Sequence, residues 1–450
     1  HTLTFSGHGD SSIEERMSTL AGEGIELPIA TDHNVHIDYV PHAEKIGALR
    51  FFTPVIGNEV TTKLGHFNVF PIRSGAEPPN HNAENWEGIF GSIFKTPDVE
   101  IVILNHSRDL HSNFRPFGPE NHIAIAGENY DGWKLQANGM ELINSGATQT
   151  DPYQLFHDWL GLLNRGHMIT PIGCSDSHDV ARHFVGQGRT YVQVDDSDPG
   201  KISVEQAIRS FREGRVVVSY GLFANITVNE KFGIGDLAAT NREPVHVDVE
   251  VHGPAWCSAE RIRLFANGRL IRTKKIDRDA QKRAGLKAEA HWELPAYKHD
   301  VHLVAIADGP GVTAPHWPMA KAYQPTSTHF EPRARSMTGA VWVDGDQNGR
   351  RDAAFDYATR LVKQHGDDLP ALVGELAKYD APTRIQVASV LRASGVSPLD
   401  SRLDSALEDA SESVKRSFVV YRDAWRRSER ARAGQANAGQ ANAGQANAGQ

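Results

Sequence analysis

Short apolar segments in the first half of the chain repeatedly end in histidine, aspartate or glutamate. These segments have the length and apolar content of buried strands, and helical patterns such as residues 11–22 lie between them. The segments are residues 25–30, 52–60, 66–70, 100–104 and 168–173, and the polar residues at their ends include Asp32, His33, Glu59, His66, His106, Asp176 and His178. Repeated strand–helix units of this kind predict an α/β barrel whose site lies at the carboxyl ends of its strands.

The overall composition is that of a globular protein and argues against several other classes. The chain has 450 residues, of which 40% are apolar and 23% charged, and this length suits two or three domains. A net charge of −9 argues against nucleic acid as the partner, because nucleic-acid-binding surfaces need a positive field. No apolar run reaches about 18 residues, so we expect no membrane span. Two cysteines, Cys174 and Cys257, are too few for a disulfide framework, although one bridge between them stays open.

The sequence pattern changes along the chain and predicts four parts. Residues 1–235 form the α/β barrel, and residues 240–335 form a small antiparallel, immunoglobulin-like β-sandwich. The sandwich is indicated by period-two alternation and by Asn267-Gly268 between two strand-like runs, which is a strong hairpin signal. Residues 340–430 have helical patterns, and residues 431–450 repeat small and polar residues that offer no apolar face, so we expect a disordered tail.

Histidine is the residue type that points to chemistry. The chain has 22 histidines, and fourteen of them fall within residues 1–200. Imidazole and carboxylate are the ligands that proteins use for Zn, Mn and Fe, and a bound ion of this type generates hydroxide at neutral pH. A single histidine is more often a surface or hydrogen-bonded residue, but the repetition at strand ends favours a metal site.

Five motifs, taken in order, resemble the polymerase-and-histidinol-phosphatase (PHP) superfamily of metallohydrolases, and within it the carbaryl-hydrolase-like branch. The resemblance covers about residues 1–230. The motifs are the segment from His1 to Asp10, Thr31-Asp32-His33-Asn34, Gly57 to Thr62 with Gly65 to Asn68, Asn105-His106-Ser107-Arg108, and Ser175-Asp176-Ser177-His178 followed by residues 185–192. The resemblance implies a distorted (βα)7 barrel that holds two or three divalent ions at its mouth.

The same resemblance implies a ligand set and roles for neighbouring residues. Glu59 is expected to bridge two ions, Asp32 to lie beside the ligands, and His8 is an alternative to Asp10. The implied metal ligands are His1, Asp10, His33, Glu59, His66, His106, Asp176 and His178.

Three further residues are candidates for contact with the substrate. Arg108 and Arg189 are candidates to bind an anionic group, because guanidinium suits planar and phosphate oxyanions, or else to form structural ion pairs. His183 is a candidate general acid for the leaving group, or else a loop histidine.

The first residue departs from the family pattern. In the family a further histidine stands two residues before the position of His1. We expect a truncated chain that lacks this ligand; the alternative is a mature terminus whose α-amine partly replaces it. Members of this branch with attached sandwich domains resemble exported bacterial proteins, so export to the periplasm or the medium is the expectation, with the cytoplasm left open.

The predicted function is metal-dependent hydrolysis of a small-molecule substrate, either a phosphoester or an amide, carbamate or carboxyl ester. Asp176 and His178 are the residues on which we expect catalysis to depend most. One alternative is a non-catalytic binding or surface-associated module built around the sandwich. Another is copper chelation by the amine and imidazole of His1. The sequence does not indicate an oligomeric state.

Residues 344–352 resemble the start of a calcium loop. Asp344, Asp346 and Asn348 stand at positions one, three and five, and Asp352 stands at position nine. Position twelve, normally a bidentate glutamate, is Phe355. The alternative is an Asp/Asn/Gly turn between a strand and a helix.

Overall fold

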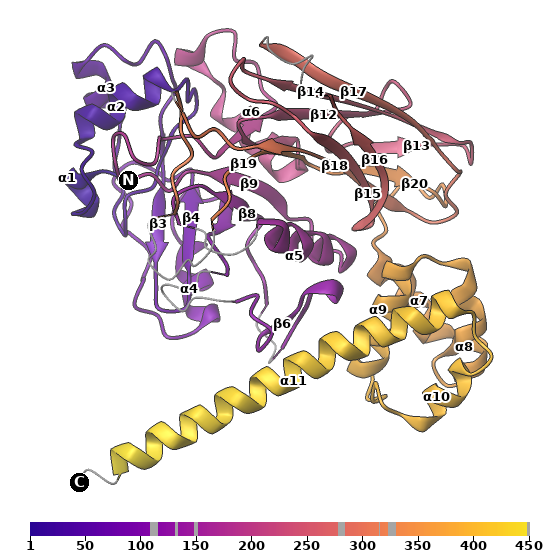
Figure 1. Ribbon diagram of the computed structural model, residues 1–450. Coiled ribbons are helices and arrows are strands. Elements are labelled where there is room, and N and C mark those ends of the chain that lie inside the picture. Colours follow the sequence, from indigo (N-terminus) through magenta and orange to yellow (C-terminus); the bar gives the residue numbers. More distant parts are fainter. Residues whose placement is uncertain are drawn as a thin grey trace.

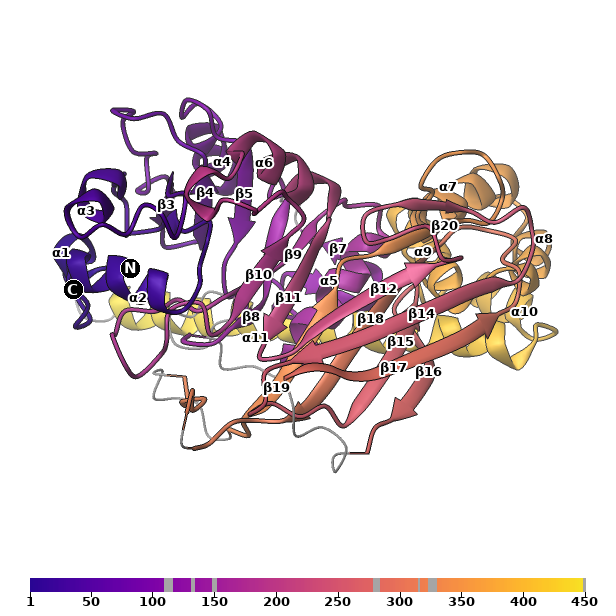
Figure 2. The same cartoon turned by 90° about the horizontal axis from the view of Figure 1, so that it is seen from above.

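The computed structural model describes residues 1–108, 116–130, 134–147, 152–277, 284–314, 316–322 and 330–447. An α/β part comes first in the chain, two packed β-sheets follow, and helices end it (Figure 1). From above, the sheets lie between the α/β part and the C-terminal helices α7, α8 and α10 (Figure 2). Among the described helices, none combines the length and the apolar character that a bilayer crossing requires.

A five-stranded sheet in the order β3-β4-β5-β8-β9 forms the centre of the α/β part. Its strands are β3 (Asn58–Thr61), β4 (His66–Phe70), β5 (Ile101–Leu104), β8 (Gly139–Asn144) and β9 (Thr170–Cys174). The pairs β3-β4 and β4-β5 are antiparallel, whereas β5-β8 and β8-β9 are parallel. Every residue of β5 and β8 is buried, as is typical of strands covered on both faces.

The mixed α/β architecture is confirmed, but the sheets of the described residues do not close into a barrel. A separate parallel pair, β1 (Ile29–Ala30) and β2 (Val55–Ile56), stands beside the central sheet. The chain runs directly from β2 into β3, yet among the described strands β1 pairs with β2 alone. The edge of β1 that faces away from β2 is therefore not paired with another described strand, and the strands do not form a closed barrel.

Helices cover the α/β part and contribute its core. The central core joins Phe67 and Val69 of β4 to Phe90 of α4 and Trp159 of α5. A capping box of Ser12 and Glu15 begins α2, where each satisfies a backbone N–H of the first turn. The helices and short elements of this part are α1 (Leu3–Ser6), α2 (Ile13–Gly22), α3 (Val40–Lys45), α4 (Trp86–Ile93), β6 (His122–Ile123), η1 (Ala124–Ala126), β7 (Glu128–Asn129), α5 (Pro152–Asn164), η2 (Pro199–Lys201) and α6 (Val204–Glu213).

Two sheets form the middle of the molecule. The larger has the order β10-β11-β19-β18-β15-β16, with β20 paired to β18 and β13 paired to β20; the smaller has the order β12-β14-β17. The strands are β10 (Arg189–Val192), β11 (Val216–Tyr220), β12 (Phe223–Val228), β13 (Leu237–Ala239), β14 (Val245–Gly253), β15 (Arg261–Ala266), β16 (Arg269–Lys275), β17 (Gly285–Leu294), β18 (Val301–Pro310), β19 (Arg333–Thr338) and β20 (Val341–Asp344). The predicted hairpin is present: β15 and β16 pair antiparallel, and Asn267 and Gly268 between them both have positive φ, as a type I′ turn requires.

The sandwich does not begin at the boundary that we predicted between residues 235 and 240. β12 already belongs to the smaller sheet, and β11 pairs with β19, so the larger sheet continues into the α/β part through β10 and β11. The residues around position 235 have the pattern of a turn. A local pattern of this kind cannot indicate that β11 pairs with β19, more than 100 residues further along the chain.

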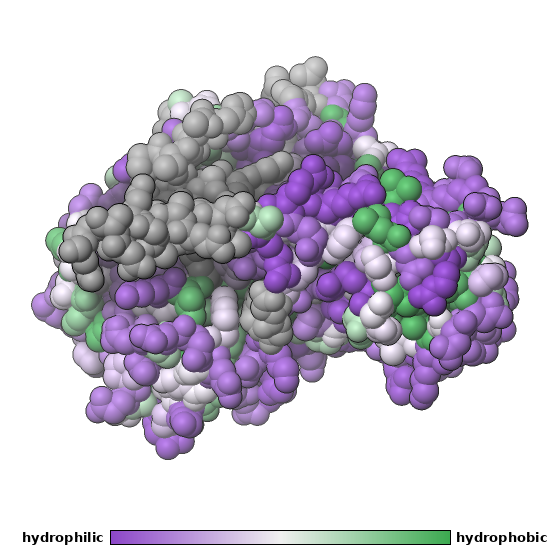
Figure 3. Space-filling view, turned by 90° about the horizontal axis from the view of Figure 1, so that it is seen from below, coloured by the Kyte–Doolittle hydropathy of each residue, from purple (hydrophilic) through white to green (hydrophobic). Residues whose placement is uncertain are grey.

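The C-terminal region was predicted to be helical from residue 340. Its first helix begins at Ala354 instead, and β20, at the start of the predicted range, belongs to the larger sheet. Its core includes Leu372, Leu391, Phe418 and Tyr421. Its elements are α7 (Ala354–His365), α8 (Leu369–Glu375), η3 (Leu376–Lys378), α9 (Ala381–Ala393), α10 (Ser401–Leu407) and α11 (Glu412–Asn447). Seen from below, the surface is mostly hydrophilic, and apolar side chains gather over this region (Figure 3).

The last helix differs from the expected disordered tail. α11 continues through the repeat as far as Asn447 and runs out past the α/β part (Figure 1). Alanine and glutamine have high intrinsic helix propensity, so the repeat can prolong a helix that packing has already begun.

A buried carboxylate joins the helical region to the α/β part. Glu128 of β7 accepts hydrogen bonds from Ser389 Oγ at 2.8 Å and from Tyr421 Oη at 2.9 Å, and it pairs with the guanidinium of Arg392. The side chain of Glu128 is only 4% exposed. Removing one member of such a buried network leaves the others without a partner.

We therefore expect Glu128→Ala to destabilise the protein by about 3 kcal/mol. Thermal and urea unfolding measure the change. The matched control is Glu205→Ala, because Glu205 pairs with Arg209 at the surface and its side chain is 83% exposed; its effect is expected to stay below about 0.5 kcal/mol. Equal effects of the two substitutions would contradict a buried junction.

Candidate metal centre

The ends of several strands and the first residue of the chain bring their polar side chains to one place. His33 follows β1 and forms an isolated backbone bridge with Glu59 of β3. His66 begins β4 opposite Thr61, so it lies diagonally across from Glu59 on the same face of the sheet. His106 follows β5, and Asp176 follows β9. His106 and Asp176 both have positive φ, a backbone conformation that side-chain-bearing residues adopt mainly where function or packing demands it.

Glu59 lies at the centre of this cluster and is almost fully buried. Its Oε2 atom is 2.9 Å from Nε2 of His1 and 3.5 Å from Nδ1 of His33. Its Oε1 atom is 2.9 Å from Nδ1 of His66 and 3.8 Å from Nε2 of His106. The two oxygens of one carboxylate therefore face different pairs of histidines.

Asp176 and His178 complete the cluster from the other side. Oδ1 of Asp176 is 3.0 Å from Nε2 of His1. The ring of His178 stacks on that of His1, with the centroids 4.1 Å apart, and the ring of His33 also stacks on that of His1, at 4.3 Å.

Within the described residues, these side chains form three overlapping sets that could each hold one ion. In each set the ligand atoms lie within 4.8 Å of one another. The sets are Glu59-His66-His106, His1-Glu59-Asp176 and His1-His33-His178. Because Glu59 and His1 are each shared by two sets, the arrangement suits a cluster of neighbouring ions rather than separate sites. Mixed imidazole and carboxylate ligation is the donor set that Zn, Mn and Fe accept.

Burial and the neighbouring charges shift the pKa values of these groups in opposite directions. Burial disfavours the charged ring of His1, but Glu59 and Asp176 outweigh it and raise the pKa of His1 to about 10. The same competition, with Glu59 and Glu141 as the neighbours, raises the pKa of His106 to about 9. In turn, burial opposes ionisation of Glu59, but His1 outweighs it and holds the pKa of Glu59 well below its usual range.

For His33 and His178 the effect of burial prevails, and both rings are neutral at pH 7. Burial lowers the pKa of His33 to about 4 and that of His178 to about 3, and the charge of His1 lowers both further. Their ring nitrogens are therefore free of an extra proton at pH 7, which is the form that binds a metal.

His8, rather than Asp10, lies beside the cluster. The ring centroid of His8 is 4.4 Å from that of His178 and 5.1 Å from that of His33. Asp10 belongs to none of the three sets; its Oδ1 accepts a hydrogen bond from the backbone N–H of Val180 at 2.7 Å. Asp10 as a ligand therefore stays a prediction, and the alternative, His8, is the residue whose ring lies next to those of His33 and His178.

The two arginines hold structural positions. Arg108 forms a bidentate pair with the buried Asp158 of α5, at 2.5 and 2.9 Å. Arg189 donates from Nη1 to the carbonyl of Glu23 at 3.0 Å and from Nε to the carbonyl of Gly186. These contacts match the structural alternative stated for both guanidinium groups.

His183 is also placed differently from its predicted role as a general acid. Its ring is buried, and Nε2 lies 3.0 Å from the carbonyl oxygen of Lys321. It is in none of the three ligand sets. The contact with residue 321 ties the loop after His178 to a segment far along the chain.

Glu141 of β8 is a residue of the centre that the sequence analysis missed. Its Oε2 accepts hydrogen bonds from the backbone N–H of His106 at 2.6 Å and from Nδ2 of Asn144 at 3.1 Å, and its Oε1 accepts from Sγ of Cys174 at 2.8 Å. Asn144 in turn reaches Oδ2 of Asp176 at 3.3 Å. A charged residue inside the apolar run 139–144 was the signal that could have identified it.

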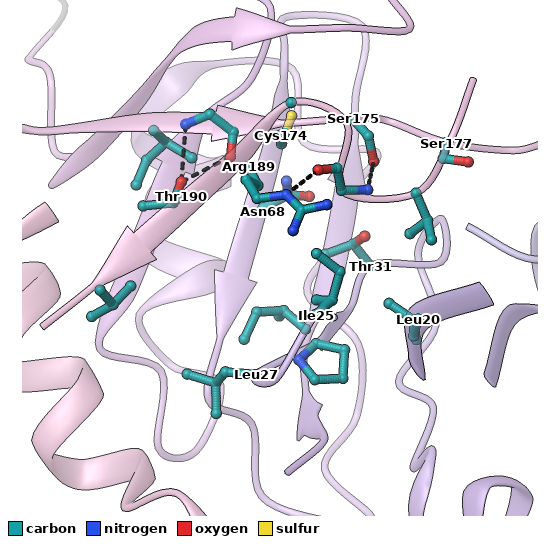
Figure 4. A pocket seen from close by; sticks show the side chains of 18 of the residues that line it. Leu20, Ile25, Leu27, Thr31, Asn68, Cys174, Ser175, Ser177, Arg189 and Thr190 are labelled. Atoms are coloured by element: carbon teal, nitrogen blue, oxygen red, sulfur yellow. Dashed lines mark hydrogen bonds between the residues drawn. The ribbon is translucent and has the colours of Figure 1, made fainter. Parts of the chain in front are cut away.

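A cavity of about 290 Å³ adjoins the cluster. Its lining includes the three centre residues His1, Glu59 and Asp176 together with apolar side chains from the strand-like segment 25–29. Figure 4 shows Ile25 and Leu27 on one side of this cavity, with Asn68, Cys174 and Arg189 on the other. The centre therefore borders on a cavity of the α/β part that has both polar and apolar walls.

The loop that resembles a calcium site is built as a turn. Asp344 accepts hydrogen bonds from the backbone N–H groups of Asn348 and Gly349, and Asp352 pairs with Arg360. Asp344 and Asp346 do approach a third carboxylate, Asp300, which the sequence analysis missed. These hydrogen bonds are the ones expected for an Asp/Asn/Gly turn, which was the alternative to a calcium loop. Calcium binding here stays a prediction.

Comparison with known proteins adds no relative. No family model, no curated protein sequence and no solved structure matches this chain. The geometry of the cluster is therefore the observation from which function has to be inferred.

Loading with a divalent ion tests whether the cluster binds metal. We expect the protein to retain Mn²⁺ or Zn²⁺ after desalting, and Glu59→Ala to lose most of the bound ions because two of the three ligand sets contain its carboxylate. Elemental analysis measures the bound ions. The control is His81→Ala, since His81 contacts the side chain of Asn82 on the surface. Equal metal content in Glu59→Ala and wild type would contradict the assignment.

Proton release provides a second test. At pH 7 the metal-free protein holds protons on His1 and His106, whose pKa values of about 10 and 9 lie above that pH. An incoming ion displaces them, so binding should release about two protons. Isothermal titration calorimetry in buffers with different ionisation enthalpies counts these protons, and a release near zero would contradict the shifts.

The raised pKa values of His1 and His106 also determine how the stability of the protein changes with pH. A proton that binds more tightly in the folded state stabilises it. The contribution of these two histidines to the stability of the metal-free protein should therefore be fully present below about pH 6.5, the ordinary pKa of histidine, and be lost as the pH rises toward 9–10. Melting temperatures measured across this range in the presence of a chelator check the direction.

Proposed function

We propose that this protein is a metal-dependent hydrolase whose centre is the cluster around Glu59. The observation that carries the proposal is the buried carboxylate of Glu59, which two of the three ligand sets share and which four histidines surround. Clusters with two or three divalent ions are a recurrent solution for hydrolysis at neutral pH. We further propose that residues 1–235 are a PHP-type unit, in which the described strands are an open form of a (βα)7 barrel; the order of the motifs supports this.

The chain's own residues suit a group of adjacent ions. Glu59 is the proposed bridge, because Oε1 faces His66 and His106 while Oε2 faces His1 and His33. Asp176 supplies a second carboxylate, next to His1. When bound, such ions, of Zn, Mn or Fe, lower the pKa of a coordinated water and polarise the electrophilic centre of a substrate.

Neighbouring residues hold these ligands in place. Thr61 Oγ1 lies 2.8 Å from Nδ1 of His33 and fixes the orientation of that ring, leaving Nε2 toward the cluster. Glu141 holds the backbone at His106 and, through Asn144, the carboxylate of Asp176. Such supporting contacts typically change metal affinity 10–100-fold when they are removed.

The proposed substrate is a small molecule with a hydrolysable phosphoester or an amide, carbamate or carboxyl ester bond. Both classes need an attacking hydroxide and stabilisation of negative charge on oxygen, which a group of ions provides. A panel of nitrophenyl phosphates against naphthyl carbamates and esters, assayed with the metal-loaded protein, separates the two classes. Absence of hydrolysis across the whole panel with several different ions would count against a hydrolase.

Substitution of Asp176 or His178 tests the dependence of turnover on the centre. We expect Asp176→Ala and His178→Ala to lower turnover of the best panel substrate by several orders of magnitude, because each removes a ligand. Both residues lie beyond the end of β9, so the melting transition should remain cooperative. Asp195→Ala is the control, since Asp195 is exposed and accepts only a local bond from Ser197. Near wild-type turnover in an Asp176→Ala and His178→Ala double variant would sink the assignment.

A further inference from the structure

Arg16 is a buried cation next to the cluster, on a helix that is itself firmly placed. It lies on α2 and is 1% exposed. Its helix neighbours Ile13, Met17 and Leu20 pack into one apolar core with Ala30 of β1 and with Tyr39. The packing of α2 against this core therefore fixes the position of the guanidinium, which has almost no contact with solvent.

All described hydrogen-bond acceptors of this guanidinium are backbone carbonyl oxygens. Nε donates to the carbonyl of His1 at 2.9 Å. Nη2 donates to the carbonyl of Ser177 at 3.0 Å and, at 3.5 Å, to that of Asp179. The amino group of His1 also donates to the carbonyl of Ser177, at 3.2 Å. One side chain thus connects the residue that carries the His1 ring to the loop that carries Asp176 and His178.

The opposite side of the N-terminal segment is held by Asp32. Its fully buried carboxylate accepts hydrogen bonds from the backbone N–H of Thr2 at 2.7 Å, from Ser6 Oγ at 2.8 Å and from Tyr39 Oη at 3.0 Å. The peptide group between His1 and Thr2 is therefore gripped at both polar atoms: Arg16 binds its carbonyl and Asp32 binds its N–H. This leaves the backbone at His1 little freedom to move away from Glu59.

Arginine suits this position better than lysine does. Its planar fork donates in two fixed directions at once, whereas an ammonium group is a compact point charge on a flexible stem. Burial of a guanidinium among neutral acceptors is costly, so it is expected to persist only where its hydrogen bonds fix something of use.

We propose that Arg16 is a positioning residue of the metal centre, which sets the His1 ligand against the loop of residues 175–179. This inference rests on the proposed metal function. The proposal divides the three ligand sets. His1-Glu59-Asp176 and His1-His33-His178 depend on Arg16, because both contain His1 and a residue of the loop 175–179. Glu59-His66-His106 contains no residue of either segment, so it does not depend on Arg16.

The experiment compares metal binding by the full-length chain and by Arg16→Lys and Arg16→Met. Zn²⁺ or Mn²⁺ is titrated by calorimetry, and the bound ions are counted by elemental analysis after desalting. We expect one class of ion to retain wild-type affinity and the remaining ions to bind about 10–100-fold more weakly. A residue that served the fold alone would change all classes together or none.

The matched control is Arg165→Lys. Arg165 is also largely buried, but it donates to Gln386 and Ser389 of the helical region, outside the metal centre. We expect this variant to bind metal as the wild type does. A loss of affinity equal to that of Arg16→Lys would overturn the inference.

The outcomes separate the inference from the proposed function. If the wild type binds no ion, both fail. If the wild type binds ions and both Arg16 variants bind them with unchanged number and affinity, Arg16 is not a positioning residue, while the hydrolase proposal stands. If Arg16→Lys loses its cooperative melting transition, the guanidinium supports the fold rather than the centre, and the inference is again overturned.

Discussion

The buried carboxylate of Glu59 is the interaction on which the arrangement of the α/β part depends. A charge at 2% exposure is tolerated only when partners of opposite charge and hydrogen-bond donors surround it. Four histidines supply these contacts, from the first residue of the chain and from the ends of different strands. In the absence of metal, the protons on His1 and His106 offset the charge.

The surrounding structure serves to bring those histidines within reach. The bridge between His33 and Glu59 and the register of β3 with β4 place the backbones of His33 and His66 beside Glu59, and Thr61 fixes the ring of His33. Three other residues of the cluster lie on irregular backbone and are held there by buried polar or charged groups: His106 by Glu141, Asp176 by Asn144, and His1 by Arg16 with Asp32. Irregular segments need such contacts, because no ladder of hydrogen bonds fixes their positions.

Much of the centre could be predicted from the sequence, because its ligands follow apolar segments whose strand character is local. His33, Glu59, His66, His106, Asp176 and His178 were all predicted in this way, and the structure brings them together. Arg16 could not be found by this reasoning, since it sits in an ordinary helical pattern. Glu141 was missed because it lies inside a strand rather than at its end, although a charge within the apolar run 139–144 was a signal. Their roles depend on tertiary contacts. Asp10 was preferred to His8 for the same reason: spacing along a loop does not say which side chain turns inward.

For the fold, the local features were predictable and the long-range pairings were not. The hairpin at Asn267-Gly268 and the helices after residue 354 follow from turn chemistry and from periodicity. The pairing of β11 with β19 joins segments more than 100 residues apart and erases the predicted boundary near residue 235. The helix that continues into the C-terminal repeat shows a different limit: composition indicated disorder, although alanine and glutamine, which make up most of the repeat, have high helix propensity.

The most direct test of this account is anomalous X-ray scattering from crystals of the protein loaded with Mn²⁺ or Zn²⁺. The account predicts at least two neighbouring peaks, each about 2.0–2.3 Å from its ligand atoms, with Glu59 contributing one oxygen to each. A single peak bound elsewhere, or a loaded crystal in which Glu59 contacts no ion, would contradict the claim that this carboxylate organises a metal centre.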